Sequence, residues 1–513
     1  MSKELQIQSI FRLTPMQQGI LFHSLLDRNS HAYFEQVSFT LNGFLDVGLL
    51  EQSLRMLFDR HEILRSNIFH AAIEEPKLIV FRQKTPTIRF EDISRMDEPG
   101  KTTFVEQWIR KDKEAGFELT RDELLRVSIL QCARDAYKLI VSFHHIIMDG
   151  WCLEIVLKEW FQVYMSLQRK EEVRLEQVPA YETYLKWLDK QDKAGALAFW
   201  KQYLDSYEQQ SLLPADGKSG VVQGYDPQQR IITFDPALTG QLVSLAKASK
   251  VTLSTLFHAI WGLLLMKYND TDDVVFGSVV SGRPEDLPGA EHMVGLFINT
   301  VPVRIYGEGA QTFSGLVQQV QQSVMKAIQH HYVPLADIQS VSPLKNDLIH
   351  HILAFENFPG TQDVSDDDEL RRIAVSDMEG FEQTSYPFNV SVVPGESLRV
   401  KFSYNGLLYG AEHIQRLGRH LLQIARTVVS RPDAALHEVD MVTAEEKQAI
   451  LSGFNGTKAP YPKEKTVHQL FEEQVERTPD HPAAIFEGQR LTYRELNARA
   501  NRLARVLRNK GVG

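Results

Sequence analysis

One stretch constrains the local fold more than any other part of the chain. Residues 138–143 form a short apolar run rich in β-branched side chains, which is typical of a strand. Residues 153–167 then carry apolar side chains at helical spacing, so a helix follows. Asp149 and Gly150, between the two, supply a turn and a helix start. The order strand, tight turn, helix therefore places His144 and His145 at the end of the strand.

The two adjacent histidines should have different surroundings, because successive side chains at a strand end point to opposite faces. We expect one imidazole to face a cavity and the other to face packed structure and hydrogen-bond there. Imidazole can accept and release a proton near neutral pH, which suits it to catalysis. Asp149 can fix the turn or pair with an arginine. Core packing or a fortuitous turn would explain the same residues without catalysis. The catalytic and the structural interpretation therefore both remain open at this point.

The size and charge of the chain limit the classes of protein it can be. A length of 513 residues exceeds what one compact core supports and indicates two or three domains. Hydrophobic residues make up 43% and charged residues 24%, which favours a folded enzyme or scaffold over a disordered adaptor. The net charge is −10 and no Lys/Arg run occurs, so we expect no nucleic-acid partner.

The sequence carries no pattern for export, membrane insertion or metal binding. No apolar stretch reaches membrane-spanning length, and residues 1–5 do not look like a secretion signal, so we expect a cytoplasmic protein without a membrane partner. Cys132 and Cys152 are the only cysteines, too few for a disulfide framework or a zinc knuckle. The 17 histidines are scattered and lack metal-ligand spacing. We expect no bound metal and no cofactor held by the chain itself.

Helical and strand patterns alternate along both halves, which predicts an α/β (α+β) fold class. Residues 181–207 are predicted as one long helical stretch between the halves. The second half has a predicted helix over 252–268 and strands over 274–280 and 301–305.

Two polar residues of the second half are candidates for the site. Arg283 lies in a turn after the 274–280 strand and is the candidate partner of Asp149; an exposed loop arginine is the alternative. Asn299 lies in an apolar segment that leads into the next strand. Its amide could orient a backbone group or a substrate, and plain burial is the alternative.

Residues 451–465 contain the glycines and prolines of a linker, and a new folded segment begins after them. A helix over 467–477 and a strand over 483–486 are predicted. Thr492 and Glu495 have the spacing of a capping box at the start of another helix. We expect this segment to be the beginning of a domain that continues in a longer protein. The sequence contains no glycine-rich phosphate-binding loop.

Several motifs, taken in their order, resemble the condensation domains of non-ribosomal peptide synthetases. Residues 144–150, His-His-Ile-Ile-Met-Asp-Gly, match the HHxxxDG signature, which related chloramphenicol-acetyltransferase-like enzymes share. The further motifs are Leu13–Gln17 with Gly19 and Leu21–His23, Arg60–Glu62 with Leu64–Arg65, Ser281–Arg283, and Gly295–Thr300. The resemblance covers roughly residues 10–450. Residues 491–496 resemble the first core motif of an adenylation domain.

The resemblance implies an architecture of two chloramphenicol-acetyltransferase-like lobes, a pseudo-dimer in a V with a central tunnel. Its implied boundaries are a tail or docking segment at 1–12, an N-lobe at 13–180, a C-lobe at 181–450, a linker at 451–465, and the truncated beginning of an adenylation domain at 466–513.

The resemblance also implies a reaction, in which the amine of an acceptor aminoacyl thioester attacks a donor peptidyl thioester and forms a peptide bond. It makes His145 the catalytic residue, as a general base or as a group that orients the amine. The other site residues it implies are His144, Asp149, Gly150 and Arg283 as structural residues, and Asn299 and Asn389 as candidate substrate or tunnel residues.

Both substrates would arrive on 4′-phosphopantetheine arms, carried by an upstream donor and a downstream acceptor carrier domain, beside an adenylation domain of the same synthetase. The first motif and residues 386–389 resemble the subclass whose donor ends in a D-residue. Residues 1–12 could dock an upstream protein that ends in an epimerisation domain; a disordered terminus is the alternative. The competing functions are epimerisation, CoA-dependent acyl transfer and a catalytically silent docking scaffold.

Overall fold

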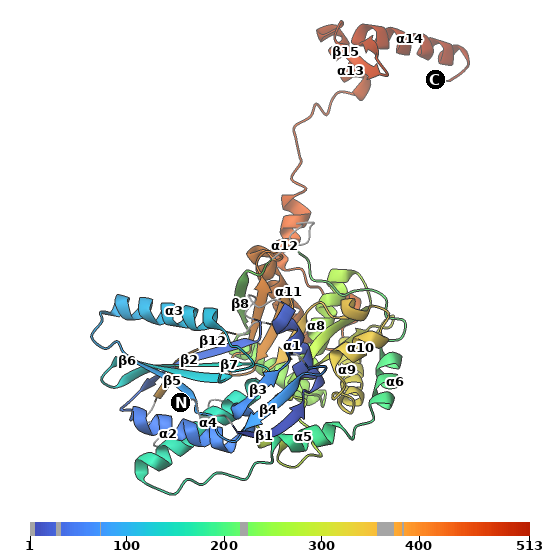
Figure 1. The fold of residues 1–513 in the computed structure, drawn as a ribbon. Helices are drawn as coiled ribbons and strands as arrows, with labels where there is room; N and C mark the ends of the chain where they lie inside the picture. The colour runs from blue at the N-terminus through green and yellow to red at the C-terminus, as the bar shows by residue number, and fades with distance from the viewer. Residues whose placement is uncertain are drawn as a thin grey trace. The chain divides into compact units, whose positions relative to one another are not determined.

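The structure is a computed structural model that describes residues 6–26, 32–71, 73–215, 224–356, 374–381 and 384–512. The chain folds into two compact units, Met1–Thr443 and Ala444–Gly513 (Figure 1). The larger unit mixes helices and strands along its whole length, which confirms the predicted α/β class.

The first part of the larger unit alternates helices and strands. Polar residues mark the helix starts: Asp46 caps α2 and Asp97 caps α3, each through its carboxylate. The elements are β1 (Ile7–Arg12), α1 (Pro15–Leu26), β2 (Phe34–Asn42), α2 (Val47–Arg60), β3 (Ser66–Phe69), β4 (Lys77–Phe81), β5 (Thr87–Asp92), α3 (Glu98–Ala115), β6 (Leu125–Ala133), β7 (Ala136–His144) and α4 (Gly150–Arg169).

The main sheet of this part has five strands in the order β12-β2-β7-β6-β5. Strand β7 lies in its centre and pairs antiparallel with β2 and β6, so that Phe34 lies opposite His144. Strand β12 (Ala374–Phe381) comes from the second part of the unit and completes the sheet beside β2. A smaller sheet has the order β1-β4-β3.

The second part of the unit contains a six-stranded sheet in the order β10-β9-β11-β13-β14-β8. Strand β11 lies parallel to both of its neighbours, and the other pairs are antiparallel. The elements are α5 (Tyr181–Leu188), α6 (Lys193–Tyr203), β8 (Pro227–Thr233), α7 (Pro236–Ala248), α8 (Leu253–Asn269), β9 (Asp273–Val280), β10 (Asn299–Tyr306), α9 (Phe313–Ile328), α10 (Leu335–Val341), β11 (Ile352–Phe355), β13 (Phe388–Val393), β14 (Arg399–Asn405) and α11 (Ala411–Ser430).

Helix α8 is buried on all sides, because every residue from Thr255 to Met266 is buried and its apolar side chains belong to the core of the second part. Among the described residues, no single helix is long and apolar enough to cross a membrane. Within the same ranges, α7 and α8 reach that length and composition only as a pair, and they meet at a bend of 106°.

Residues of the second part extend the hydrophobic core of the first part. Tyr181, Leu296 and Phe297 pack with the core of the first part. The Tyr181 hydroxyl donates a hydrogen bond of 2.7 Å to the carbonyl of Leu296. Together with β12, these residues interlock the two parts.

One expected segment differs in the structure, and another contains a strand. The helical stretch predicted over 181–207 is two helices, because the Asp192 carboxylate accepts the Gly195 amide hydrogen and starts α6 anew after the turn that ends α5. The tail expected at 1–12 contains strand β1, which pairs with β4 over Ile7–Arg12. Residues 1–5 of that tail lie outside the described residues.

The smaller unit contains α12 (Ala444–Gln448), a π-helical turn at Ala449–Gly453, α13 (Val467–Arg477), β15 (Pro482–Phe486), β16 (Gln489–Thr492) and α14 (Tyr493–Asn509). Residues 454–466 form neither helix nor strand. The predicted capping box is confirmed: the Thr492 hydroxyl accepts from the Glu495 amide, and the Glu495 carboxylate accepts from the Thr492 amide.

Candidate active site

The predicted strand, turn and helix are confirmed, because β7 ends at His144 and α4 begins at Gly150. Asp149 is the N-cap of α4, and its Oδ1 accepts the Cys152 amide hydrogen at 3.1 Å. The Asp149 side chain is fully buried. The carboxylate therefore satisfies a helix-end donor that no water reaches.

The two histidines have the opposite surroundings that the strand geometry predicts. His144 is buried, its Nδ1 accepts the Ile146 amide hydrogen at 3.1 Å, and its ring lies edge-on to Phe117. Burial, with a smaller contribution from neighbouring His145, lowers the pKa of His144 to about 3. His144 therefore stays neutral near pH 7, whereas half-buried His145 lines the large cavity described below.

Asp149 and Arg283 pair as predicted, with 3.7 Å between Oδ1 and Nη2. The second carboxylate oxygen accepts the amide hydrogens of Phe297 (3.2 Å) and Ile298 (3.4 Å). The Arg283 guanidinium lies over the Phe297 ring, 4.3 Å from its centroid. This buried charge pair is therefore surrounded by further polar contacts, as a buried ion pair requires.

Cys152 adds a contact between the two parts of the unit that the sequence did not reveal. Its thiol donates to the Gly295 carbonyl (3.0 Å), and its sulfur accepts from the Gly295 amide and from Arg283. Burial, reinforced by the charge of Asp149, raises the pKa of Cys152, so the group stays a thiol. We infer that Cys152 helps to hold the 295–298 segment against the start of α4.

Gly282 allows this packing through its backbone. Its φ is +61°, a left-handed conformation that favours glycine. A β-carbon at this position would overlap the carbonyl oxygen of Phe297. The turn before Arg283 can therefore approach the 297–298 segment only without a side chain.

A cavity of about 1570 Å³ opens beside the turn, and its walls come from both parts of the larger unit. Of the predicted site residues, those that line it are His145, Gly150, Asn299 and Asn389. His144, Asp149 and Arg283 lie behind the wall, where their side chains are engaged as described above. Of the two adjacent histidines, His145 is therefore the one that faces the cavity.

The two candidate asparagines hold backbone segments. Asn299 donates from Nδ2 to the carbonyls of His331 (2.8 Å) and Val333 (2.6 Å), and its Oδ1 accepts from the Thr300 amide. Asn389 donates from Nδ2 to the carbonyl of Tyr386 (3.4 Å), and its Oδ1 accepts from the Thr384 hydroxyl at 2.7 Å. Both amides therefore shape the cavity wall, which is one of the two roles expected for Asn299.

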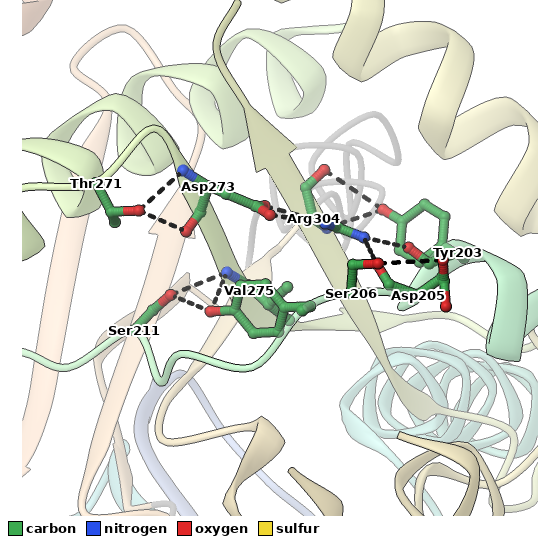
Figure 2. A network of polar contacts seen from close by, with 9 residues as sticks. Tyr203, Asp205, Ser206, Ser211, Thr271, Asp273, Val275 and Arg304 are labelled. Atoms are coloured by element: carbon green, nitrogen blue, oxygen red, sulfur yellow. Dashed lines mark hydrogen bonds and ion pairs between the residues drawn. The ribbon is translucent and has the colours of Figure 1, made fainter. Parts of the chain in front are cut away.

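A second polar network joins the end of α6 to β9 and β10 (Figure 2). Arg304 donates from Nε and Nη2 to the Asp273 carboxylate, and from Nη1 to the carbonyls of Tyr203 and Asp205. The Tyr203 hydroxyl accepts the Arg304 amide hydrogen at 2.8 Å. A cavity of about 880 Å³ lies beside these residues. Because the guanidinium is already held by protein groups, we interpret this network as structural.

Sequence reasoning missed Tyr33, which also lines the large cavity and lies edge-on to the His145 ring. It missed Tyr33 because the pairing of β2 with β7 brings the two residues together, and no spacing in the sequence shows this. Within the described ranges, no group of three His, Cys, Asp or Glu side chains could hold a metal ion.

Comparison with known proteins assigns the fold and the family. The Condensation domain family matches residues 7–451, and the AMP-binding enzyme family matches residues 471–513. Gramicidin S synthase 2 from Brevibacillus brevis is 42% identical over 512 residues, which are 99% of this chain and 12% of that protein. The chain therefore spans only a small part of this relative.

Two solved structures have the same fold. A four-domain nonribosomal peptide synthetase bound to AMP and glycine matches with a TM-score of 0.77 at 20% identity, over 99% of this chain and 39% of that one. The first condensation domain of the calcium-dependent antibiotic synthetase matches with a TM-score of 0.68 at 18% identity, over 85% of this chain and 100% of that one. With the family match over residues 7–451, the chain belongs to the condensation domains, the amide-forming enzyme domains of non-ribosomal peptide synthetases, and the beginning of an AMP-binding region follows.

Proposed function

We propose that this chain forms a peptide bond between two thioesters, each held on the 4′-phosphopantetheine arm of a carrier domain. The size of the cavity supports this proposal. Its volume of about 1570 Å³ exceeds the about 300–1,000 Å³ of a pocket for one small ligand. The donor and acceptor arms are substrates that an upstream and a downstream carrier domain deliver.

In the proposed reaction, the acceptor amine nitrogen attacks the carbonyl carbon of the donor thioester. The carbon–sulfur bond then breaks, and the proton lost by the nitrogen leaves with the released thiol. His145 is the proposed catalytic residue, because it is the histidine of the pair that lines the cavity. It takes the amine proton as a general base, or it orients the amine and stabilises the tetrahedral intermediate. A pH–rate profile of His145 variants separates these two roles.

The remaining site residues support the turn that carries His145. Asp149 and Arg283 tie the start of α4 to the 297–298 segment, and His144 holds the turn through the Ile146 amide. Gly150, the first residue of α4, is exposed and lines the cavity. Its missing side chain leaves room for a substrate beside His145.

The experiment that tests the proposal loads two carrier domains with aminoacyl groups and follows dipeptide formation. Loss of a general acid–base group lowers the rate by about 100-fold or more, and we expect this for His145→Ala. His292→Ala is the matched control, because His292 is a half-exposed histidine outside the cavity lining. Full activity of His145→Ala would refute the catalytic assignment.

We further propose that the donor ends in a D-residue and arrives from an upstream protein with an epimerisation domain. The opening motif at 13–23 and the 386–389 segment support this subclass, and Tyr386 and Asn389 line the cavity. Matched donors that end in a D- or an L-residue test the assignment. Faster turnover of the L-ended donor would contradict it. Deuterium exchange at the donor α-carbon, or turnover with free acyl-CoA, would instead favour the competing enzymes.

A further inference from the structure

The orientation of the His145 imidazole needs an explanation beyond hydrogen bonding. Its Nδ1 is buried and has no hydrogen-bond partner among the described residues. The backbone of His145 is fixed, because its amide donates to the Tyr33 carbonyl at 2.9 Å. This bond extends the pairing of β2 with β7 by one step into the turn. The backbone is therefore held, but the ring must be oriented by packing.

Tyr33 supplies a ring contact at this position. The two ring centroids lie 6.5 Å apart with the planes at 73°, an edge-to-face arrangement. On the other side, the Tyr33 ring lies 6.3 Å from that of His23. Both neighbours line the same cavity. The tyrosine ring therefore limits the rotation of the His145 imidazole on one side.

Two features keep Tyr33 in place. Its φ is +66°, a left-handed conformation that bulky residues adopt only when their surroundings impose it. Its hydroxyl donates to the Ser385 hydroxyl oxygen at 3.3 Å, and Ser385, from the second part of the unit, lines the same cavity. Strained backbone of this kind gathers at functional sites. The backbone conformation and the hydroxyl bond to Ser385 both help to fix the ring that contacts His145.

We propose that Tyr33 is a positioning residue that orients the imidazole of His145 for the reaction. The inference rests on the proposed function, in which His145 is catalytic. Tyr33 acts through its ring, so phenylalanine, which loses only the hydroxyl bond to Ser385, keeps most of this function and an aliphatic side chain does not. Misplacement of a reacting group lowers the rate of the chemical step more than it lowers substrate affinity.

The test compares Tyr33→Leu and Tyr33→Phe in the carrier-to-carrier condensation assay with the full chain. We expect Tyr33→Leu to lower kcat by about tenfold, with KM for both carrier substrates within about twofold of wild type. Tyr33→Phe should keep at least about half of kcat, because the ring contact remains and only the hydroxyl bond to Ser385 is lost. Tyr306→Leu makes the same change at a partly exposed tyrosine that does not line this cavity, and should leave kcat unchanged.

A double variant shows whether Tyr33 acts through His145. If it does, Tyr33→Leu combined with His145→Ala is no slower than His145→Ala alone. Two results would overturn the inference and leave the role of His145 intact. One is a double variant whose loss of kcat is the product of the two single losses, and the other is a wild-type kcat in Tyr33→Leu. Full activity of His145→Ala would instead overturn the proposed function itself. Should Tyr33→Leu not fold, Tyr33→Met replaces it, and loss of folded protein in both would also overturn the inference.

Discussion

Replacing Asp149 with alanine removes a buried carboxylate on which several groups of the site depend. One oxygen caps α4 through the Cys152 amide, and the other accepts from the amides of Phe297 and Ile298. The side chain of Asp149 is 0% exposed and that of its partner Arg283 only 7% exposed, so water cannot replace the carboxylate. Removing one member of a buried ion pair costs about 3 to 5 kcal/mol of unfolding free energy. We expect this loss in Asp149→Ala.

A second capping aspartate provides the matched control. Asp46 is exposed at the start of α2, and its carboxylate accepts the Leu49 amide hydrogen at 3.1 Å. Asp46→Ala removes a helix cap of the same kind and should cost about 1 kcal/mol. The difference between the two variants, about 2 to 4 kcal/mol, measures the buried charge and the bonds to the 297–298 segment. Asp149→Asn, which keeps the shape without the charge, should lie between them.

Urea unfolding followed by tryptophan fluorescence measures these losses in the larger unit alone, because all six tryptophans precede Thr443. They are Trp108, Trp151, Trp160, Trp187, Trp200 and Trp261. Hydrogen exchange at the amides of Phe297 and Ile298 gives the local readout, and both should exchange faster in Asp149→Ala. Equal losses for Asp149→Ala and Asp46→Ala, with unchanged exchange at those amides, would refute the reasoning.

Three further predictions concern pH and backbone conformation. Burial holds the folded-state pKa of His144 at about 3. Below pH 6.5 only the unfolded chain takes up this proton, so the unfolding free energy falls as the pH falls. Between pH 7 and 5, the unfolding free energy of His144→Asn in urea titrations should fall by about 2 kcal/mol less than that of wild type. Burial also lowers the pKa of Lys84 to about 8. Between pH 8 and 10.5, the Lys84 ammonium is therefore protonated mainly in the unfolded chain, so the unfolding free energy rises with pH. In urea titrations over this window, the unfolding free energy of wild type should rise by about 2 to 3 kcal/mol more than that of Lys84→Met. Gly282→Ala should destabilise more than Gly116→Ala, by over about 1 kcal/mol in thermal and urea unfolding, since Gly116 has a similar φ of +56° but open space around it.

Local patterns were sufficient to predict the elements that carry the site. The strand, turn and helix around His145 follow from apolar spacing and from an aspartate at the helix start, which are properties of adjacent residues. The opposite surroundings of His144 and His145 follow from strand geometry alone. The sequence offered Arg283 as a candidate partner of Asp149 and an exposed loop arginine as the alternative, and the distance of 3.7 Å between the two side chains decides for the pair.

Features that depend on pairing between distant segments were not predictable. Strand β12 joins the sheet of the first part beside β2, although more than 300 residues separate them. Tyr33 meets His145 only through the register of β2 with β7. The amide of Asn299 is committed to carbonyls of residues 331 and 333, which only the folded chain brings near. The break between α5 and α6 depends on Asp192, whose capping bond prevails over a continuous helical pattern.

The contacts across the two parts also determine how activity and stability should separate among variants. Asp149 is hydrogen-bonded to the start of α4 and to the 297–298 segment. Its loss therefore weakens both the contact between the two parts and the turn before α4. Asp149→Ala is therefore expected to lower unfolding free energy and activity in parallel. In the part of the chain that the structure describes, His145 has no hydrogen-bond partner at Nδ1, and it lines the cavity, so His145→Ala removes little that stabilises the fold. A variant at His145 that lost activity only in proportion to stability would show that the residue supports the turn rather than the reaction.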